Sequence, residues 1–192
     1  AAVQAAYMGI TLLAGPTDVL GGPRGFFKAT ADEVKENYLL EGFLPDYAIE
    51  RIYKKPYAAC RHCHSAIEAA LNIRKDNGLS SEDITEVEVD TYGLAVKGHE
   101  HVEVKGAGSA KMSIPYAVAC ALRYGRVNYQ QYEEDCLEDQ ELLALARKVS
   151  VREDEAFSKL VPGKRVALVK VRAGEELYQD QVEYPLGEPE NP

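Results

Sequence analysis

Apolar side chains recur along this chain with two spacings, one of about 3.6 residues and one of two. The first spacing predicts helices, which we expect over residues 31–40, 65–75, 114–124 and 140–148. The second predicts strands, which we expect over residues 84–92, 149–151, 165–172 and 176–184, the last two joined as a hairpin at Ala173 and Gly174. This grouping predicts an α+β fold in which an antiparallel sheet packs against helices.

Two of the predicted helices carry boundary signals. The first has Ser65 and Glu68 at the spacing of a capping box, and Gly78 stands where such a helix would end. The second has Ser113 at its N-cap position and Pro115 in its first turn, where proline is tolerated. We therefore expect both helices to have defined ends.

The two ends of the chain differ from its middle. Residues 1–14 (AAVQAAYMGITLLA) predict a helix that is apolar on nearly all sides, and such a helix must be buried against something. We interpret it as the trailing helix of a larger helical body. Residues 184–192 form a polar stretch rich in proline and glycine, which is typical of a connection between elements. We therefore expect the chain to be a fragment.

The composition of the chain argues against several classes of protein. The chain has 192 residues and a net charge of −9, so the charge footprint of a nucleic-acid-binding protein is absent. No apolar run reaches the ~20 residues that span a bilayer, so we expect no membrane insertion. Four cysteines are too few for a disulfide scaffold, which favours a reducing, cytoplasmic location.

One short segment has the opposite charge to the rest of the chain. Residues 51–61 contain four cationic side chains and no acidic one, and they lead directly into the helix predicted from Ser65. A helix N-terminus offers unpaired N–H groups and a partial positive charge. The combination predicts a site for a carboxylate or a phosphate. The alternative is a solvated basic loop that pairs with acidic groups elsewhere.

Residues 60–64 (CRHCH) allow three interpretations. They match the attachment signature of c-type haem, which needs an oxidising compartment. Cys60 and Cys63 could instead bind zinc together with His99 and His101, although the two histidines lack the usual loop spacing. The third interpretation, which we favour, is that Cys60 and His64 face an anionic substrate at the helix start.

Residues 106–111 (GAGSAK) resemble part of a nucleotide-binding loop. The segment lacks a third glycine and a following βαβ unit, and its lysine is not placed as in a Walker loop. We interpret it as a flexible entry that presents Lys111, Ser113 and Tyr116 at a second helix start. We therefore expect no metal, haem or nucleotide cofactor.

Four segments, taken in order, resemble motifs of the MmgE/PrpD family. They are residues 21–27 (GGPRGFF), 55–69 (KPYAACRHCHSAIEA), 110–119 (AKMSIPYAVA) and 187–192 (GEPENP). The family includes 2-methylcitrate dehydratase, cis-aconitate decarboxylase and iminodisuccinate epimerase. The chain departs from the family pattern at Ala58, where proline is usual, and at Met112, where an aromatic residue is usual.

The resemblance implies a division into domains. Residues 1–45 would be the end of a large helical domain, 46–185 a smaller α+β domain, and 186–192 a linker toward further helices. The active site would lie in the cleft between the two domains, so the helical domain of the same protein is an expected partner. A homodimer is also implied.

The resemblance also implies which residues form the site. We expect a cofactor-independent lyase of propionate metabolism that removes water from a small di- or tricarboxylic acid, similar to a 2-methylcitrate dehydratase. The candidate catalytic residues are Lys55, His64 and Tyr116, and the candidate substrate-binding residues are Cys60, Arg61, Lys111 and Ser113. A histidine stands at the position of Cys60 in the decarboxylase branch, which favours dehydration here. The alternatives are a decarboxylase or epimerase of the same family, or a non-catalytic module for ligand binding or dimerisation.

Overall fold

The computed structural model describes residues 2–11, 13–35, 37 and 48–192, which fall into two units. The first unit is Ala1–Glu50 and the second is Arg51–Pro192. The boundary predicted between residues 45 and 46 lies outside the described residues.

The first unit contains two short helices, α1 (Ala2–Ile10) and α2 (Phe26–Thr30). Helix α1 confirms the helix predicted over residues 1–14 only as far as Ile10, and Val3, Tyr7 and Ile10 are each more than two-thirds exposed. The described residues of the first unit therefore do not supply the expected cover for this apolar helix.

The helix predicted over residues 31–40 is not borne out where the structure describes it. Residues 31–35 are irregular, and the helical turn comes earlier, in α2. Residues 36 and 38–40 lie outside the described residues. A one-turn helix, η1 (Ala48–Arg51), follows at the boundary between the units.

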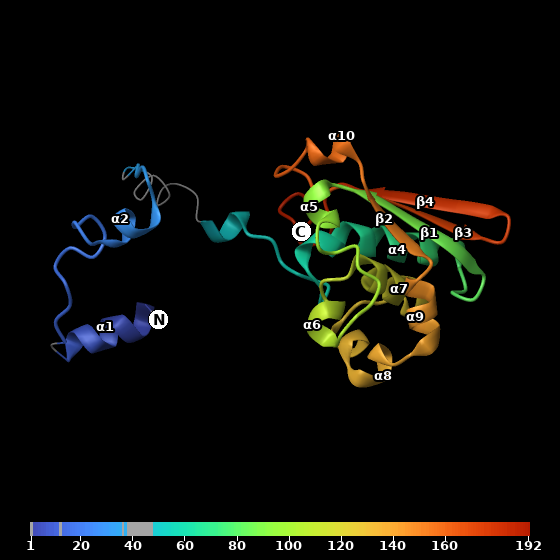
Figure 1. The fold of residues 1–192 in the computed structure, drawn as a ribbon, viewed down its shortest axis with the longest axis horizontal. Coiled ribbons are helices and arrows are strands. Elements are labelled where there is room, and N and C mark those ends of the chain that lie inside the picture. Colours follow the sequence, from blue (N-terminus) through green and yellow to red (C-terminus); the bar gives the residue numbers. More distant parts are fainter. Residues whose placement is uncertain (1, 12, 36, 38–47) are drawn as a thin grey trace. The chain divides into compact units, whose positions relative to one another are not determined.

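A four-stranded sheet forms the frame of the second unit, and Figure 1 shows its strands side by side. The strands are β1 (Ile84–Thr91), β2 (Val149–Glu153), β3 (Ala167–Ala173) and β4 (Glu176–Val182), in the order β2-β1-β3-β4. The α+β class is confirmed. Strand β3 pairs antiparallel with β1 and β4, as predicted, but β2 runs parallel to β1 because the chain crosses over between them through several helices.

The two faces of the sheet have different roles. Val87 and Val89 point into the core, while Glu88 and Asp90 point to the other face, as alternation along a strand requires. The register shifts between Ile84 and Glu86, which turns Ile84 into the core although it shares the parity of the acidic residues.

Ion pairs cover the outer face of the sheet. The Arg152 guanidinium lies 2.6 Å from the Glu88 carboxylate, and the Lys170 ammonium lies 2.7 Å from the Asp90 carboxylate. Arg172 and Glu86 continue the row at 3.6 Å. Charges of opposite sign on neighbouring strands therefore satisfy one another on this face.

Two helices cover the inner face. Helix α4 (His64–Asn77) packs against β3 and β4, and α7 (Ile114–Tyr124) packs against α4 and β2. The first nine residues of α7 are buried, so this helix is the centre of the core. The remaining elements are short or lie at the edges: η2 (Arg61–Cys63), α5 (Gly93–Val96), α6 (Ala107–Ala110), η3 (Tyr129–Tyr132), α8 (Glu134–Leu137), α9 (Gln140–Ala146) and α10 (Glu155–Ser158).

The capping predictions had opposite outcomes. Ser113 caps α7 as predicted, because its Oγ accepts the N–H of Tyr116 at 3.1 Å. The capping box predicted for α4 is wrong. That helix begins at His64, Ser65 Oγ donates to the carbonyl oxygen of Arg165, and the Glu68 carboxylate accepts the N–H of Leu186 at 2.6 Å. Both side chains therefore bind segments distant in sequence, which local spacing does not reveal.

Candidate functional site

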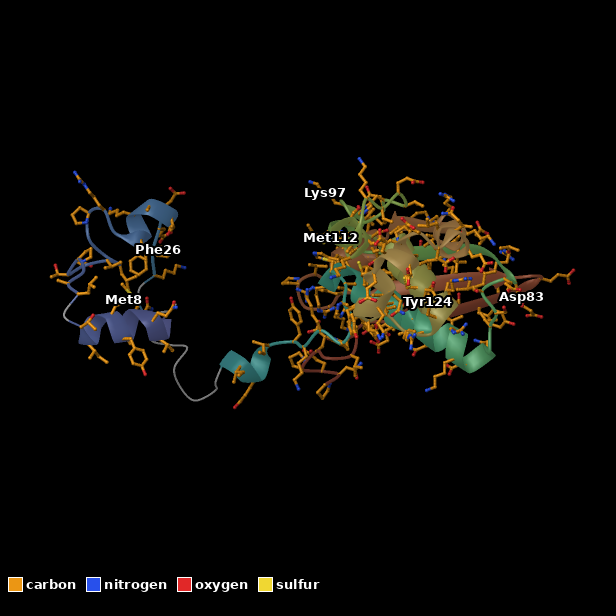
Figure 2. The ribbon with its side chains drawn as sticks, turned by 90° about the horizontal axis from the view of Figure 1, so that it is seen from below. Met8, Phe26, Asp83, Lys97, Met112 and Tyr124 are labelled. Atoms are coloured by element: carbon orange, nitrogen blue, oxygen red, sulfur yellow. The ribbon has the colours of Figure 1, made fainter. Side chains whose placement is uncertain are left out.

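A hollow of about 660 Å³ lies on the second unit where three segments of chain converge. These are residues 55–60, which lead into η2, residues 111–112, which lead into α7, and residues 128–129, at the start of η3. Its lining consists of Lys55, Pro56, Tyr57, Ala58, Ala59, Cys60, Lys111, Met112, Asn128 and Tyr129. Met112 is exposed to solvent and is labelled in Figure 2.

Backbone hydrogen bonds join the three segments. The N–H of Cys60 donates to the carbonyl oxygen of Lys111 at 2.7 Å, and the N–H of Ala58 donates to that of Val127 at 3.3 Å. Asn128 begins η3 by a capping box with Gln131, which fixes the third segment. The walls of the hollow are thus held by main-chain bonds.

The charge of this hollow is positive. Lys55 and Lys111 are exposed lining residues, and none of the other lining residues is acidic. The Lys111 ammonium lies 5.7 Å from the centroid of the Tyr132 ring, within the range of a cation–π contact. Two ammonium groups on a partly apolar surface can hold the carboxylates of a small organic acid.

His64 lies immediately behind this wall. Its imidazole is fully buried, its Nε2 is 3.3 Å from the carbonyl oxygen of Ala59, and its ring packs edge-on against Tyr57 with centroids 5.3 Å apart. Burial and the positive charge of Arg61 lower the pKa of His64 to about 4. The imidazole is therefore neutral at pH 7, and it contacts Ala59 and Tyr57, two residues that line the hollow.

Tyr57 connects the wall to helix α4. Burial and the nearby Glu68 carboxylate raise the pKa of Tyr57 to about 12, so its hydroxyl stays protonated at neutral pH.

Arg61 is buried and binds an internal carboxylate. Its guanidinium forms an ion pair with Glu188, and Arg165 lies 3.8 Å from the same carboxylate. The guanidinium also lies 4.8 Å from the centroid of the Tyr53 ring. Arg61 is not among the residues that line the hollow, so the anion that it binds in the structure is Glu188.

Ser113 and Tyr116 are fully buried beside the hollow. Ser113 Oγ donates to the carbonyl oxygen of His101 at 2.6 Å, and the Tyr116 hydroxyl donates to that of Gln131 at 2.7 Å. These bonds join α7 to the segments that precede and follow it. Of the seven predicted site residues, the structure places Lys55, Cys60 and Lys111 on the hollow, and the other four are not among its lining residues. The roles assigned to all seven stay predictions.

Met112, Asn128 and Tyr129 also line the hollow, and the sequence patterns did not predict them as parts of the site. The spacing of Asn128 and Gln131 is a capping signal that could have been found. For the exposed side chains of Met112 and Tyr129 there was no comparable signal.

The structure also bears on the metal-binding, glycine-loop and membrane interpretations of the sequence. Among the described residues, no three His, Cys, Asp or Glu side chains come together as metal ligands could. Residues 107–110 form the single turn α6, which leads to Lys111 at the hollow and to Ser113 at the start of α7. In the part of the chain that the structure describes, no helix is long and apolar enough to cross a membrane.

The fold and the hollow together define a small α+β domain with a cationic hollow that is large enough for a small-molecule ligand. The family model described as the MmgE/PrpD C-terminal domain matches residues 57–192, and the chain belongs to this family.

Several curated relatives carry one name. The chain is 28% identical over 155 residues to the 2-methylcitrate dehydratase of Salmonella typhimurium and 27% identical over 155 residues to that of Escherichia coli. The mitochondrial 2-methylcitrate dehydratase of Yarrowia lipolytica is 27% identical over the same length. Each match covers 73% of this chain but only 29–32% of the relative, so the chain spans about a third of the relatives' length.

Proposed function

We propose that this chain contributes one wall of the active site of a 2-methylcitrate dehydratase-like lyase. The observation that carries the proposal is the pairing of Lys55 and Lys111 on one hollow that has no acidic lining residue. The names of the relatives support the choice of a lyase acting on a small tricarboxylic acid.

The reaction would begin beside a carboxylate. A base removes a proton from the neighbouring carbon, negative charge builds on the carboxylate oxygens, and a carbon–carbon double bond forms as the hydroxyl group leaves with a proton as water. Lys55 and Lys111 would stabilise the charge that develops, because positioned cations act most strongly on charge that appears during the reaction. No cofactor is part of this proposal.

We propose that one of the three candidate catalytic residues, Lys55, His64 or Tyr116, transfers the proton. The Tyr116 hydroxyl is committed to the carbonyl oxygen of Gln131, and His64 is neutral behind Ala59. Lys55 is the one of the three that lines the hollow, which favours it for direct contact with substrate. Cys60 and Lys111 would contact bound acid, and Arg61 and Ser113 would act by holding neighbouring segments.

The test uses the complete gene product and 2-methylcitrate as substrate. Formation of the unsaturated acid is followed by ultraviolet absorbance, and Lys55→Ala is expected to lower kcat/KM by at least ~100-fold, the cost of one lost charge-stabilising group. Lys75→Ala, which removes an exposed lysine at the opposite end of α4, is the matched control and should retain activity. Near-normal kcat/KM in Lys55→Ala would overturn the proposal.

Other outcomes identify the alternatives. Release of carbon dioxide would indicate a decarboxylase, and formation of a diastereomer of unchanged mass would indicate an epimerase. Saturable binding of the acid with no turnover would indicate a binding module. The homodimer is proposed on the family resemblance and the cytoplasmic location on the low cysteine content, and light scattering and cell fractionation test them.

A further inference from the structure

The C-terminal residues 184–192, here called the strap, lie against the segment that carries Lys55. The N–H of Lys54 donates to the carbonyl oxygen of Gly187 at 2.8 Å. One residue earlier in the strap, the N–H of Leu186 donates to the Glu68 carboxylate in α4 at 2.6 Å. The strap therefore contacts both the irregular segment that leads to the hollow and helix α4.

Gly187 allows this close approach. Its φ of +91° is a backbone conformation that residues with a Cβ rarely adopt. A Cβ at this position would also clash with the carbonyl oxygen of Lys54 and lie 3.3 Å from Pro56 Cδ. Lys54 and Pro56 are the two neighbours of Lys55 in sequence. The strap thus lies against the backbone of Lys54 and beside the ring of Pro56, one on each side of the lysine.

Three further bonds hold the strap in place. Glu188 pairs with the buried Arg61 and lies 3.8 Å from Arg165. The amide of Asn191 donates to the carbonyl oxygen of Tyr184 at 2.9 Å, which closes the strap on itself. Because a buried arginine without its partner is costly, the Arg61–Glu188 pair fixes the strap firmly against η2.

The opposite side of the Lys55 segment is anchored as well. Beyond Lys55, the N–H groups of Ala58 and Cys60 donate to Val127 and Lys111. Among the described residues, a single main-chain hydrogen bond joins residues 54–57 to another segment, and it runs from Lys54 to the strap. The strap therefore determines where Lys55 enters the hollow.

We propose that the strap is a positioning element for Lys55, with Gly187 and Glu188 as its positioning residues. This inference rests on the proposed function only in assigning a chemical role to Lys55. It differs from the linker role that the sequence predicted for residues 186–192, because it gives this segment a direct effect on the geometry of the site.

The primary experiment compares Gly187→Ala with Gly98→Ala in the complete gene product. Gly98 has a φ of +87°, nearly that of Gly187, but a Cβ there meets nothing within 4 Å, so it matches the backbone strain without the clash. Hydrogen–deuterium exchange of the peptide that covers residues 53–60 is measured together with kcat/KM.

In Gly187→Ala we expect exchange at the Lys54 amide to rise at least tenfold and kcat/KM to fall at least tenfold, while α4 and α7 keep their protection. In Gly98→Ala both quantities should stay close to those of the unmodified protein. Equal behaviour of the two variants would overturn the inference.

A second variant covers the case in which Gly187→Ala does not fold. Glu188→Gln removes the charge of the ion pair but keeps the size of the side chain, and Glu188→Asp keeps the charge. Faster exchange at Lys54 in Glu188→Gln, with partial restoration in Glu188→Asp, supports the inference, and unchanged exchange in both overturns it. If the gene product turns over no acid, the proposed function fails, but the exchange measurements still decide the role of the strap.

Discussion

The backbone N–H of Cys60 lies 2.7 Å from the carbonyl oxygen of Lys111, and this bond joins two segments that are far apart in sequence. Through it the segment that precedes α4 and the segment that precedes α7 form neighbouring walls of one hollow. The two lysines that these segments carry, Lys55 and Lys111, consequently face the same volume. This arrangement leads to the following predictions.

Replacement of Lys111 by alanine should weaken the binding of citrate about tenfold, because one of two cations facing the acid is lost. The difference between this variant and the unmodified protein should shrink as salt is raised, since the lysine is exposed and its field is screened. Isothermal titration calorimetry at two salt concentrations measures both effects. Lys75→Ala is the control, and equal affinities of Lys111→Ala and Lys75→Ala would contradict the prediction.

His64 should make the stability of the fold depend on pH. Its pKa is about 6.5 in an unfolded chain and about 4 in the fold, because burial and Arg61 disfavour its charged form. The folded chain therefore resists protonation, so stability is fully present above pH ~6.5 and is lost as pH falls from ~6.5 toward 4, by up to about 3 kcal/mol. Nδ1 of this ring has no hydrogen-bond partner among the described residues, so an added proton there would be unpaired.

Urea unfolding between pH 7.5 and pH 4.5, compared for the unmodified chain and His64→Gln, measures this contribution. Burial also lowers the pKa of His62, so part of the pH dependence should persist in His64→Gln. His101→Gln serves as the control with one histidine removed elsewhere. The prediction fails if His64→Gln loses stability with falling pH as steeply as His101→Gln.

Arg74 should stabilise the C-terminal ends of both main helices. Its Nη1 donates to the carbonyl oxygen of Leu79, after α4, at 3.0 Å, and to that of Leu122, in the last turn of α7, at 2.8 Å. Arg74→Met keeps much of the apolar stem but loses both bonds, so we expect the free energy of unfolding to fall by about 2 kcal/mol. Thermal and urea unfolding measure the change, and Lys75→Met, one residue along on the exposed face, should change it by less than ~0.5 kcal/mol.

Met112 should favour acids with an alkyl substituent. Its exposed thioether lines the hollow together with Pro56 and the Tyr129 ring, which form an apolar surface near the lysines. Burial of one methyl group contributes about 0.8 kcal/mol, or roughly a fourfold change in affinity. Met112→Ser should therefore weaken 2-methylcitrate binding by up to that factor while leaving citrate unchanged. Parallel loss of affinity for both acids would show that the side chain does not discriminate between them.

The helices and strands of the second unit were largely predictable because burial repeats at regular spacing. The valines of β1 alternate with acidic residues, and α7 carries its own cap in Ser113. The predicted antiparallel pairing was right for β3 and β4, but the parallel pairing of β2 with β1 was missed. That pairing depends on the crossover that α7 and α9 make between the two strands in sequence, with α7 packed against α9 and β2, and no local pattern of residues encodes it.

The candidate site was predictable in its charge and only partly in its geometry. The sequence by itself determined that a cationic segment precedes a long helix and that Lys111 precedes a second one, because composition and helix signals are local properties. Only the tertiary structure decided that Arg61 binds Glu188 rather than lining the hollow, that Ser65 and Glu68 bind distant segments rather than cap α4, and that Tyr116 donates to Gln131. The physical reason is that a buried polar group must be paired, and its partner is selected by three-dimensional packing, which brings together residues from any part of the chain.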